Sequence, residues 1–157
     1  MKQPCLLLAL SFGAVLPAIA GPIACPDPAK AVQVAACPSE EELRYTFMGY
    51  CGDDRRLYAS DADTCASYEN YRKQKNVALW ESADGAFQAY LSCDLPPDAL
   101  KHLKPVSIAV TRLGKLTRLS CSYGENATFT HRTKAQCQVQ GNGDCAADPV
   151  ACKASCD

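Results

Sequence analysis

Ten cysteines that follow a secretory leader constrain this chain more than any other feature. The leader combines a positive start at Lys2, an apolar run over residues 6–16 and a small-residue cleavage site ending at Ala20, the three parts of a signal peptide. An even number of cysteines beyond the cut predicts up to five disulfides formed in an oxidising compartment, with their pairing left open by the spacing. The ten are Cys25, Cys37, Cys51, Cys65, Cys93, Cys121, Cys137, Cys145, Cys152 and Cys156.

Cleavage near Ala20 predicts a periplasmic or secreted protein. Lipidation of Cys25 is the alternative, but Pro22 stands where a lipobox requires an aliphatic residue, and nine cysteines would then remain for pairing. Asn126 begins a glycosylation sequon, which matters only in a eukaryotic secretory pathway. The leader does not distinguish a bacterial from a eukaryotic source.

The remaining chain has the size and charge of a single domain without a nucleic-acid footprint. Removal of 20 residues from the 157 leaves 137, enough to bury a hydrophobic core. Fifteen Lys and Arg residues stand against 17 Asp and Glu, with the two signs interspersed, which argues against nucleic-acid binding. No later segment approaches the ~20 apolar residues of a membrane span, so no transmembrane anchor is predicted.

Local patterns predict both helices and paired strands. A capping box from Ser39 to Glu42 begins a helix that Gly52 ends, and the spacing of Leu43, Phe47 and Tyr50 gives it one apolar stripe. Further helices are predicted over 63–76 and 96–103, and strands over 77–82, 86–93, 106–112, 116–123, 127–132 and 135–140. These elements predict an α+β domain: a disulfide-rich antiparallel sheet of four to six strands with two or three helices on one face.

The domain is predicted to cover residues 21–140, and residues 141–157 form its cysteine-rich tail, in which no periodic core pattern is visible. Two segments of the order helix, strand, glycine turn and strand end in Leu-Ser-Cys at Cys93 and Cys121, 28 residues apart. If this similarity is not chance, the two hairpins share one sheet and the two cysteines lie close together. The clustering of Cys145, Cys152 and Cys156 predicts one local bridge in the tail.

The cysteines are predicted to be structural, and no metal or cofactor is expected. No pair has the C-x-x-C spacing of a zinc ribbon, a redox site or a haem attachment site. Only His102 and His131 could supply imidazole, and both fall among surface-type residues. No disulfide-bonded cysteine can act as a nucleophile, since that requires the reduced thiolate.

No catalytic pattern is present, and the protein is predicted not to be an enzyme. No serine lies in a G-x-S-x-G elbow. Paired carboxylates could still support glycoside hydrolysis, and Glu81 is the acid with a large aromatic neighbour, Trp80, although adjacent strand residues point to opposite faces. Asp84 is explained by the predicted hairpin turn. A small envelope hydrolase that uses paired carboxylates therefore stays open as an alternative.

Three segments of the chain resemble small disulfide-containing periplasmic proteins of proteobacteria. They are the Cys25-Pro26 start, Leu-Ser-Cys-Ser-Tyr over 119–123 and Cys-Gln-Val over 137–139. Some proteins of that kind are immunity proteins encoded beside antibacterial toxins. The resemblance implies a binding module, an inhibitor or immunity protein that blocks a secreted or periplasmic toxin or hydrolase by covering its surface. A structural envelope protein is a further alternative.

Aromatic and arginine side chains are the usual anchors of protein interfaces. On that ground the candidate interface residues are Trp80, Tyr90, Arg112, Arg118 and Tyr123.

Overall fold

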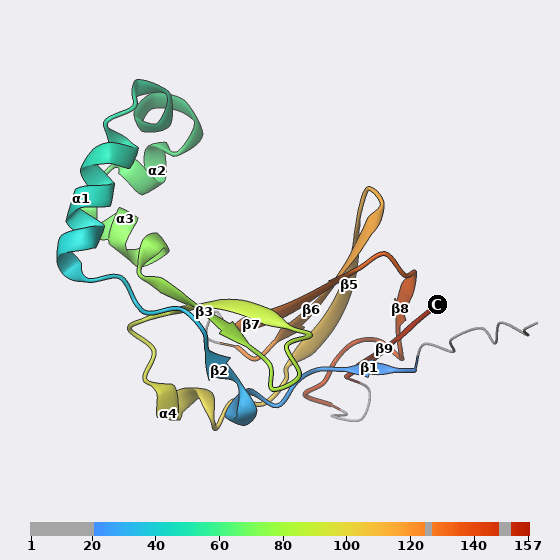
Figure 1. Ribbon diagram of the computed structural model, residues 1–157. Helices are drawn as coiled ribbons and strands as arrows, with labels where there is room; N and C mark the ends of the chain where they lie inside the picture. The colour runs from blue at the N-terminus through green and yellow to red at the C-terminus, as the bar shows by residue number, and fades with distance from the viewer. Residues whose placement is uncertain (1–20, 125–126, 148–151) are drawn as a thin grey trace, which may run out of the picture.

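Two antiparallel sheets and a set of helices make up the protein in the computed structural model, which describes residues 21–124, 127–147 and 152–157 (Figure 1). The signal peptide predicted for residues 1–20 and the sequon residue Asn126 lie outside the described residues. The combination of helices with antiparallel sheets confirms the predicted α+β class.

The larger sheet has six strands in the order β2-β3-β4-β7-β6-β5, and neighbouring strands are antiparallel. They are β2 (Val32–Gln33), β3 (Val77–Glu81), β4 (Gln88–Ser92), β5 (Ser107–Leu113), β6 (Leu116–Ser122) and β7 (Thr128–Thr133). Both predicted hairpins, β3–β4 and β5–β6, therefore belong to one sheet. β7 is inserted between them, because it pairs with β4 on one side and with β6 on the other.

Side chains alternate between a buried and an open face of this sheet, as the period of two requires. Phe87, Ala89 and Leu91 are each 2% exposed, whereas Tyr90 on the opposite face is 71% exposed. On β6, Leu119 and Cys121 continue the buried row. The core also takes in Leu100 from the short helix α4 (Pro97–Leu100).

A smaller sheet contributes to the same core. It consists of β1 (Ile23–Ala24), β9 (Lys153–Cys156) and β8 (Cys137–Val139), in the order β1-β9-β8. The predicted tail thus supplies the central strand of a second sheet, which its sequence did not indicate. The alternate residues Cys152, Ala154 and Cys156 are buried. Their side chains are small and lack the apolar bulk by which a strand is recognised in a sequence.

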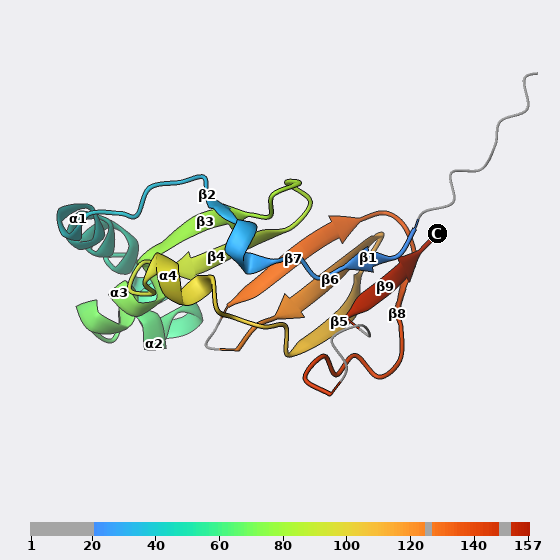
Figure 2. The same cartoon turned by 90° about the horizontal axis from the view of Figure 1, so that it is seen from below.

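The longer helices gather in a lobe at one end of the main sheet, beyond the start of β3 (Figures 1 and 2). The helical lobe, residues 39–76, contains α1 (Glu40–Cys51), the π-helical turn η2 (Arg56–Ser60), α2 (Ala62–Cys65) and α3 (Tyr68–Lys75). A single 3₁₀ turn, η1 (Pro28–Lys30), lies in the N-terminal arm.

The ends of these helices follow the predicted signals, with one difference. The capping box at α1 is formed: the Ser39 hydroxyl accepts from the Glu42 amide at 3.2 Å, and the Glu42 carboxylate accepts from the Ser39 amide at 2.7 Å. Gly52 is the C-cap of α1, as predicted. The helix predicted over 63–76 is divided into α2 and α3, because Ser67 is extended and caps α3 by accepting from the Asn70 amide.

Five disulfides join the ten cysteines. The pairs are Cys25–Cys121, Cys37–Cys93, Cys51–Cys65, Cys137–Cys156 and Cys145–Cys152. The first two tie the N-terminal arm to the main sheet, the third lies inside the helical lobe, and the last two hold the tail. The predicted local bridge in the tail is confirmed by Cys145–Cys152.

The predicted proximity of Cys93 and Cys121 is wrong. Cys93 follows β4 and Cys121 lies on β6, and β7 separates these two strands. Each cysteine instead meets a partner from the N-terminal arm.

No helix within the described ranges is long and apolar enough to cross a membrane. Among the same residues, no group of three or more His, Cys, Asp or Glu side chains could hold a metal ion.

Candidate functional site

The five candidate interface residues do not form one surface. Trp80 is partly buried and packs against the core, and Tyr90 stands on the open face of the sheet. Arg112 lines a small polar hollow near the end of the chain, whereas Arg118 is partly buried on the open face of β6. Tyr123 is 3% exposed.

Tyr123 is therefore a core residue, and its assignment to an interface is wrong. It continues the buried row of β6, and its hydroxyl donates to the carbonyl oxygen of Pro26 in the N-terminal arm. Burial raises the pKa of the Tyr123 hydroxyl. The side chain holds the arm next to the Cys25–Cys121 bridge.

The carboxylates that the sequence offered for hydrolysis bond to neighbouring strand and turn groups. Asp84 accepts from the Ser82 hydroxyl at 2.5 Å and from the Ala86 amide at 3.1 Å, which closes the hairpin turn. The Ser82 hydroxyl holds the pKa of Asp84 below its usual value. Glu81 accepts from the side-chain amide of Gln88 on the open face of the sheet, and Trp80 lies on the other face.

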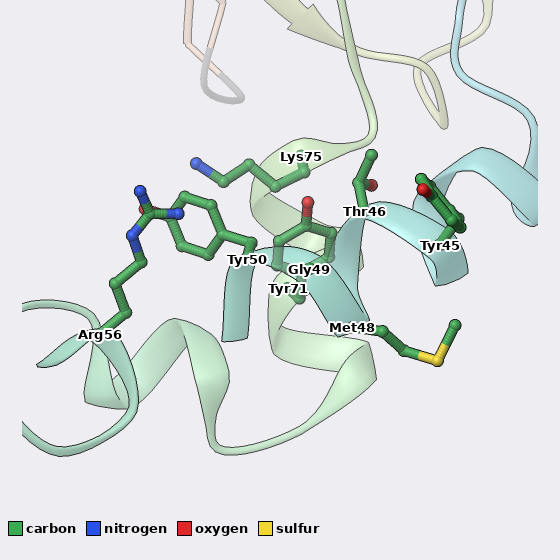
Figure 3. Close-up of a pocket in the computed structure, with 8 residues that line it drawn as sticks. All are labelled: Tyr45, Thr46, Met48, Gly49, Tyr50, Arg56, Tyr71 and Lys75. Carbon is green, nitrogen blue, oxygen red and sulfur yellow. The ribbon is translucent and has the colours of Figure 1, made fainter. Parts of the chain in front are cut away.

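A groove opens on the helical lobe. Its volume is about 760 Å³, and it runs over α1, η2 and α3. The residues that line the lobe groove are Tyr45, Thr46, Met48, Gly49, Tyr50, Arg56, Tyr71 and Lys75 (Figure 3). Aromatic rings, a thioether and two cations therefore meet at one place.

Tyr50 is the fixed centre of the lobe groove. The guanidinium carbon of Arg56 lies 4.0 Å from the centroid of its ring, and the ammonium nitrogen of Lys75 lies 4.7 Å from it (Figure 3). Its hydroxyl donates to Asp61 at 3.0 Å, and this bond raises the pKa of the Tyr50 hydroxyl. Such cation–π contacts and a satisfied hydroxyl hold the ring in one orientation.

Aromatic packing supports the groove from below. Phe47 contacts both Tyr68 and Tyr71, with ring centroids 5.6 and 5.3 Å apart, and Tyr71 also contacts Tyr50 at 5.8 Å. Edge-to-face and tilted arrangements of this kind are the favourable ones for aromatic pairs. The Cys51–Cys65 bridge joins the last residue of α1 to the last residue of α2.

The charged side chains that line the lobe groove are both positive. Arg56 and Lys75 are its charged lining residues, and neither forms an ion pair within the part of the chain that the structure describes. Among the described residues no acidic side chain lines the groove, and the carboxylate of Asp61 next to it accepts the hydrogen bond from the Tyr50 hydroxyl. The lobe groove can therefore accept an apolar group together with a negative charge.

Sequence reasoning missed this groove. It identified the stripe of Leu43, Phe47 and Tyr50 that packs within the lobe, but Tyr45 and Met48, three residues apart, form a second apolar pair on α1. Two large apolar residues outside the packing stripe of an amphipathic helix were the available signal.

Comparisons of the chain with protein-family models, with curated proteins and with solved structures found no match.

Proposed function

We propose that this protein is a secreted or periplasmic binding protein that acts as an inhibitor or immunity protein and covers part of a partner protein with its lobe groove. The single observation that carries the proposal is the exposure of large apolar side chains around that groove. Tyr45 is 75% exposed and Met48 is 68% exposed, and both line the groove. Apolar side chains gathered in this way on a small domain mark an interaction surface.

The composition of the groove indicates the chemistry of the partner. Tyrosine offers a broad, stiff contact surface, and methionine adapts to the shape of an apolar group. Arg56 and Lys75 beside the Tyr50 ring add positive charge, and neither forms an ion pair among the described residues. The complementary partner segment carries an aromatic or aliphatic side chain next to an Asp or Glu carboxylate.

The stiffness of the lobe favours binding by surface occlusion. The Cys51–Cys65 bridge and the clamped ring of Tyr50 order the groove before a partner arrives. A preorganised surface loses less conformational entropy on association. Five disulfides suit an oxidising compartment, in agreement with the leader sequence and with the resemblance to small periplasmic proteins.

The first experiment is a capture of partners by the tagged protein, residues 21–157, made in an oxidising compartment. Envelope and secreted fractions of the native source supply the candidates, and mass spectrometry identifies them. The proposal requires a stoichiometric protein partner whose activity falls on binding. The proposal also requires that capture depend on the lobe groove, and the following variants test this dependence.

Gly49→Leu is the decisive variant, with Gly49→Ala as its matched control. Gly49 lines the groove, and nothing lies within 4 Å of a Cβ placed on it, so we expect a leucine side chain there to extend into the groove and to occupy part of it. We expect Gly49→Leu to weaken binding at least ~10-fold, equivalent to about 1.4 kcal/mol, and Gly49→Ala to retain most of the affinity.

Tyr45→Ser and Tyr90→Ser form a second matched pair, because both tyrosines are similarly exposed but only Tyr45 lies at the groove. We expect Tyr45→Ser to cost the larger share of the affinity, about 2 kcal/mol if it is an interface anchor. If only Tyr90→Ser abolishes binding, the interface lies on the open face of the sheet and the assignment of the interface to the lobe groove is wrong.

A further inference from the structure

Two arginines stand directly opposite each other on the open face of the main sheet. Arg118 of β6 and Arg132 of β7 are cross-strand partners, so their side chains leave the same face side by side. Like charges in such a pair destabilise a sheet unless something neutralises them. Neither arginine forms an ion pair within residues 21–124, 127–147 and 152–157.

Arg118 carries a second sign of a missing partner. Its Nε is buried and has no hydrogen-bond partner among the described residues, where it is the one buried side-chain nitrogen or oxygen in that condition. A buried donor left unpaired is costly, and a guanidinium donor is satisfied most strongly by an oxyanion. An oxyanion held between the two guanidinium groups would neutralise the repulsion within the pair.

An apolar pair lies next to the arginine pair on the same face. Leu113 and Leu116 are cross-strand partners at the tip of the β5–β6 hairpin, and they are 49% and 42% exposed. Pairing of β6 with β7 ends at Thr117, so this tip extends beyond β7 (Figure 1). The order along the face, from the tip inward, is two leucines and then two arginines.

The surrounding sequence is strongly basic, although the whole chain has a formal net charge of −1. Between Asp98 and Asp144 it contains a single acid, Glu125, and seven basic residues. The seven are Lys101, Lys104, Arg112, Lys115, Arg118, Arg132 and Lys134. Lys115 lies in the hairpin turn itself, between the two leucines.

We propose that the β5–β6 hairpin docks on an anionic phospholipid surface, with lipid phosphate groups between Arg118 and Arg132 and with Leu113 and Leu116 at the boundary of the acyl chains. Guanidinium groups bind phosphate through paired hydrogen bonds, and basic residues at a membrane surface are attracted to anionic lipids. Exposed leucines beside cations are typical of segments that lie in the bilayer interface.

This docking surface is independent of the lobe groove. The helical lobe and the strands β5, β8 and β9 lie at opposite ends of the molecule (Figure 2). The two surfaces have no lining residue in common. A purely protein partner at the arginine pair is the competing occupant, and the experiment below separates the two.

The experiment is cosedimentation of residues 21–157 with vesicles of phosphatidylcholine alone or mixed in equal parts with phosphatidylglycerol. We expect binding to the anionic vesicles only, weakened as salt is raised. The double variant Arg118→Gln/Arg132→Gln should lower the partition coefficient at least ~10-fold, given a contribution on the order of 1 kcal/mol for each basic residue at the surface. Leu113→Ser/Leu116→Ser should also lower it, at unchanged net charge.

The matched control is Arg55→Gln/Lys73→Gln, which removes two exposed positive charges from the helical lobe. It should bind anionic vesicles as the unaltered protein does, and circular dichroism checks that every variant is folded. The proposal is overturned if the protein does not bind the vesicles, if the Arg118/Arg132 variant still binds, or if the control loses as much. It is also overturned if inorganic phosphate shifts the Arg118 Nε–H NMR signal while vesicles do not bind, because the site then takes a free anion.

Discussion

The guanidinium group of Arg72 donates to both carboxylate oxygens of Asp94, over 3.0 and 3.1 Å, and so joins α3 of the helical lobe to the turn after β4. The Nε of Arg72 donates at the same time to Glu40 at the start of α1, over 3.2 Å. The side-chain amide of Asn76 also donates to Asp94, over 3.0 Å. Arg72 therefore links α1 and α3 of the lobe to the turn after β4, in addition to the hydrogen bond from Asn76.

Acid should weaken this attachment. The hydrogen bond from Arg72 is the largest cause that lowers the pKa of Asp94, so the folded protein binds a proton there less readily than the unfolded chain. The resulting stability is present above the unfolded pKa of about 4 and is lost as the pH falls from there through the lower folded pKa.

Asp94→Asn should therefore lower the melting temperature at pH 6 and flatten its fall between pH 6 and pH 3. Thermal unfolding followed by circular dichroism across this range measures both effects. Added salt should narrow the difference at pH 6, because the pair is largely exposed. Parallel pH profiles for the variant and the unaltered protein would contradict this role of Asp94.

Removal of the Cys51–Cys65 bridge should loosen the helical lobe alone. The bridge closes a loop with a sequence separation of 14, for which the chain-entropy estimate is about 3 kcal/mol. In Cys51→Ala/Cys65→Ala we expect faster amide hydrogen exchange in α1 and α3 and unchanged exchange in β6. Cys145→Ala/Cys152→Ala, which opens a bridge in the tail, is the control and should leave exchange in the lobe as it was.

Gly143 should tolerate substitution much less than Gly114, although both have positive φ angles of +76° and +61°. A Cβ on Gly143 would lie 2.5 Å from the carbonyl oxygen of Ile108, whereas a Cβ on Gly114 meets nothing within 4 Å. We expect Gly114→Ala to cost about 1 kcal/mol from backbone strain, and Gly143→Ala to cost ~2 kcal/mol more from the added clash. Chemical denaturation of the two variants side by side measures the difference, and equal losses would show that the backbone near Ile108 moves aside.

Gly49→Ala should stabilise the protein. Gly49 lies inside α1, its φ is not positive, and a Cβ there meets no atom within 4 Å. Replacing glycine by alanine in a helix interior is worth about 0.5–1 kcal/mol. An unfolding midpoint at or below that of the unaltered protein would mean that the end of α1 is not helical in solution.

Local signals in the sequence predicted the elements well where the physical cause was itself local. The capping box at Ser39, the C-cap at Gly52 and the turn at Asp84 all depend on side chains within three or four residues of the backbone that they bond. The burial of Phe87, Ala89 and Leu91 followed from alternation alone. The division of the second helix at Ser67 was missed, because an extended capping residue and a helical one cannot be distinguished by apolar spacing.

Contacts between distant segments could not be predicted in this way. The expected meeting of Cys93 and Cys121 failed because β7, which follows both hairpins in the chain, is inserted between them. Tyr123 was assigned to a surface because tyrosine is common at interfaces, but the arm that covers it comes from Pro26, 97 residues earlier. Neither arrangement leaves a mark in the local pattern.

The sequence by itself determined the cysteine complement, the helix caps, the hairpins and the α+β class, because each follows from residue chemistry over a few neighbouring positions. Only the tertiary structure decided which cysteines pair, where the lobe groove opens and that Arg118 faces Arg132. These features depend on strand order, on register and on the packing of α1 against α3. Each of those is set by which long-range contacts bury the most apolar surface together, a property of the whole chain.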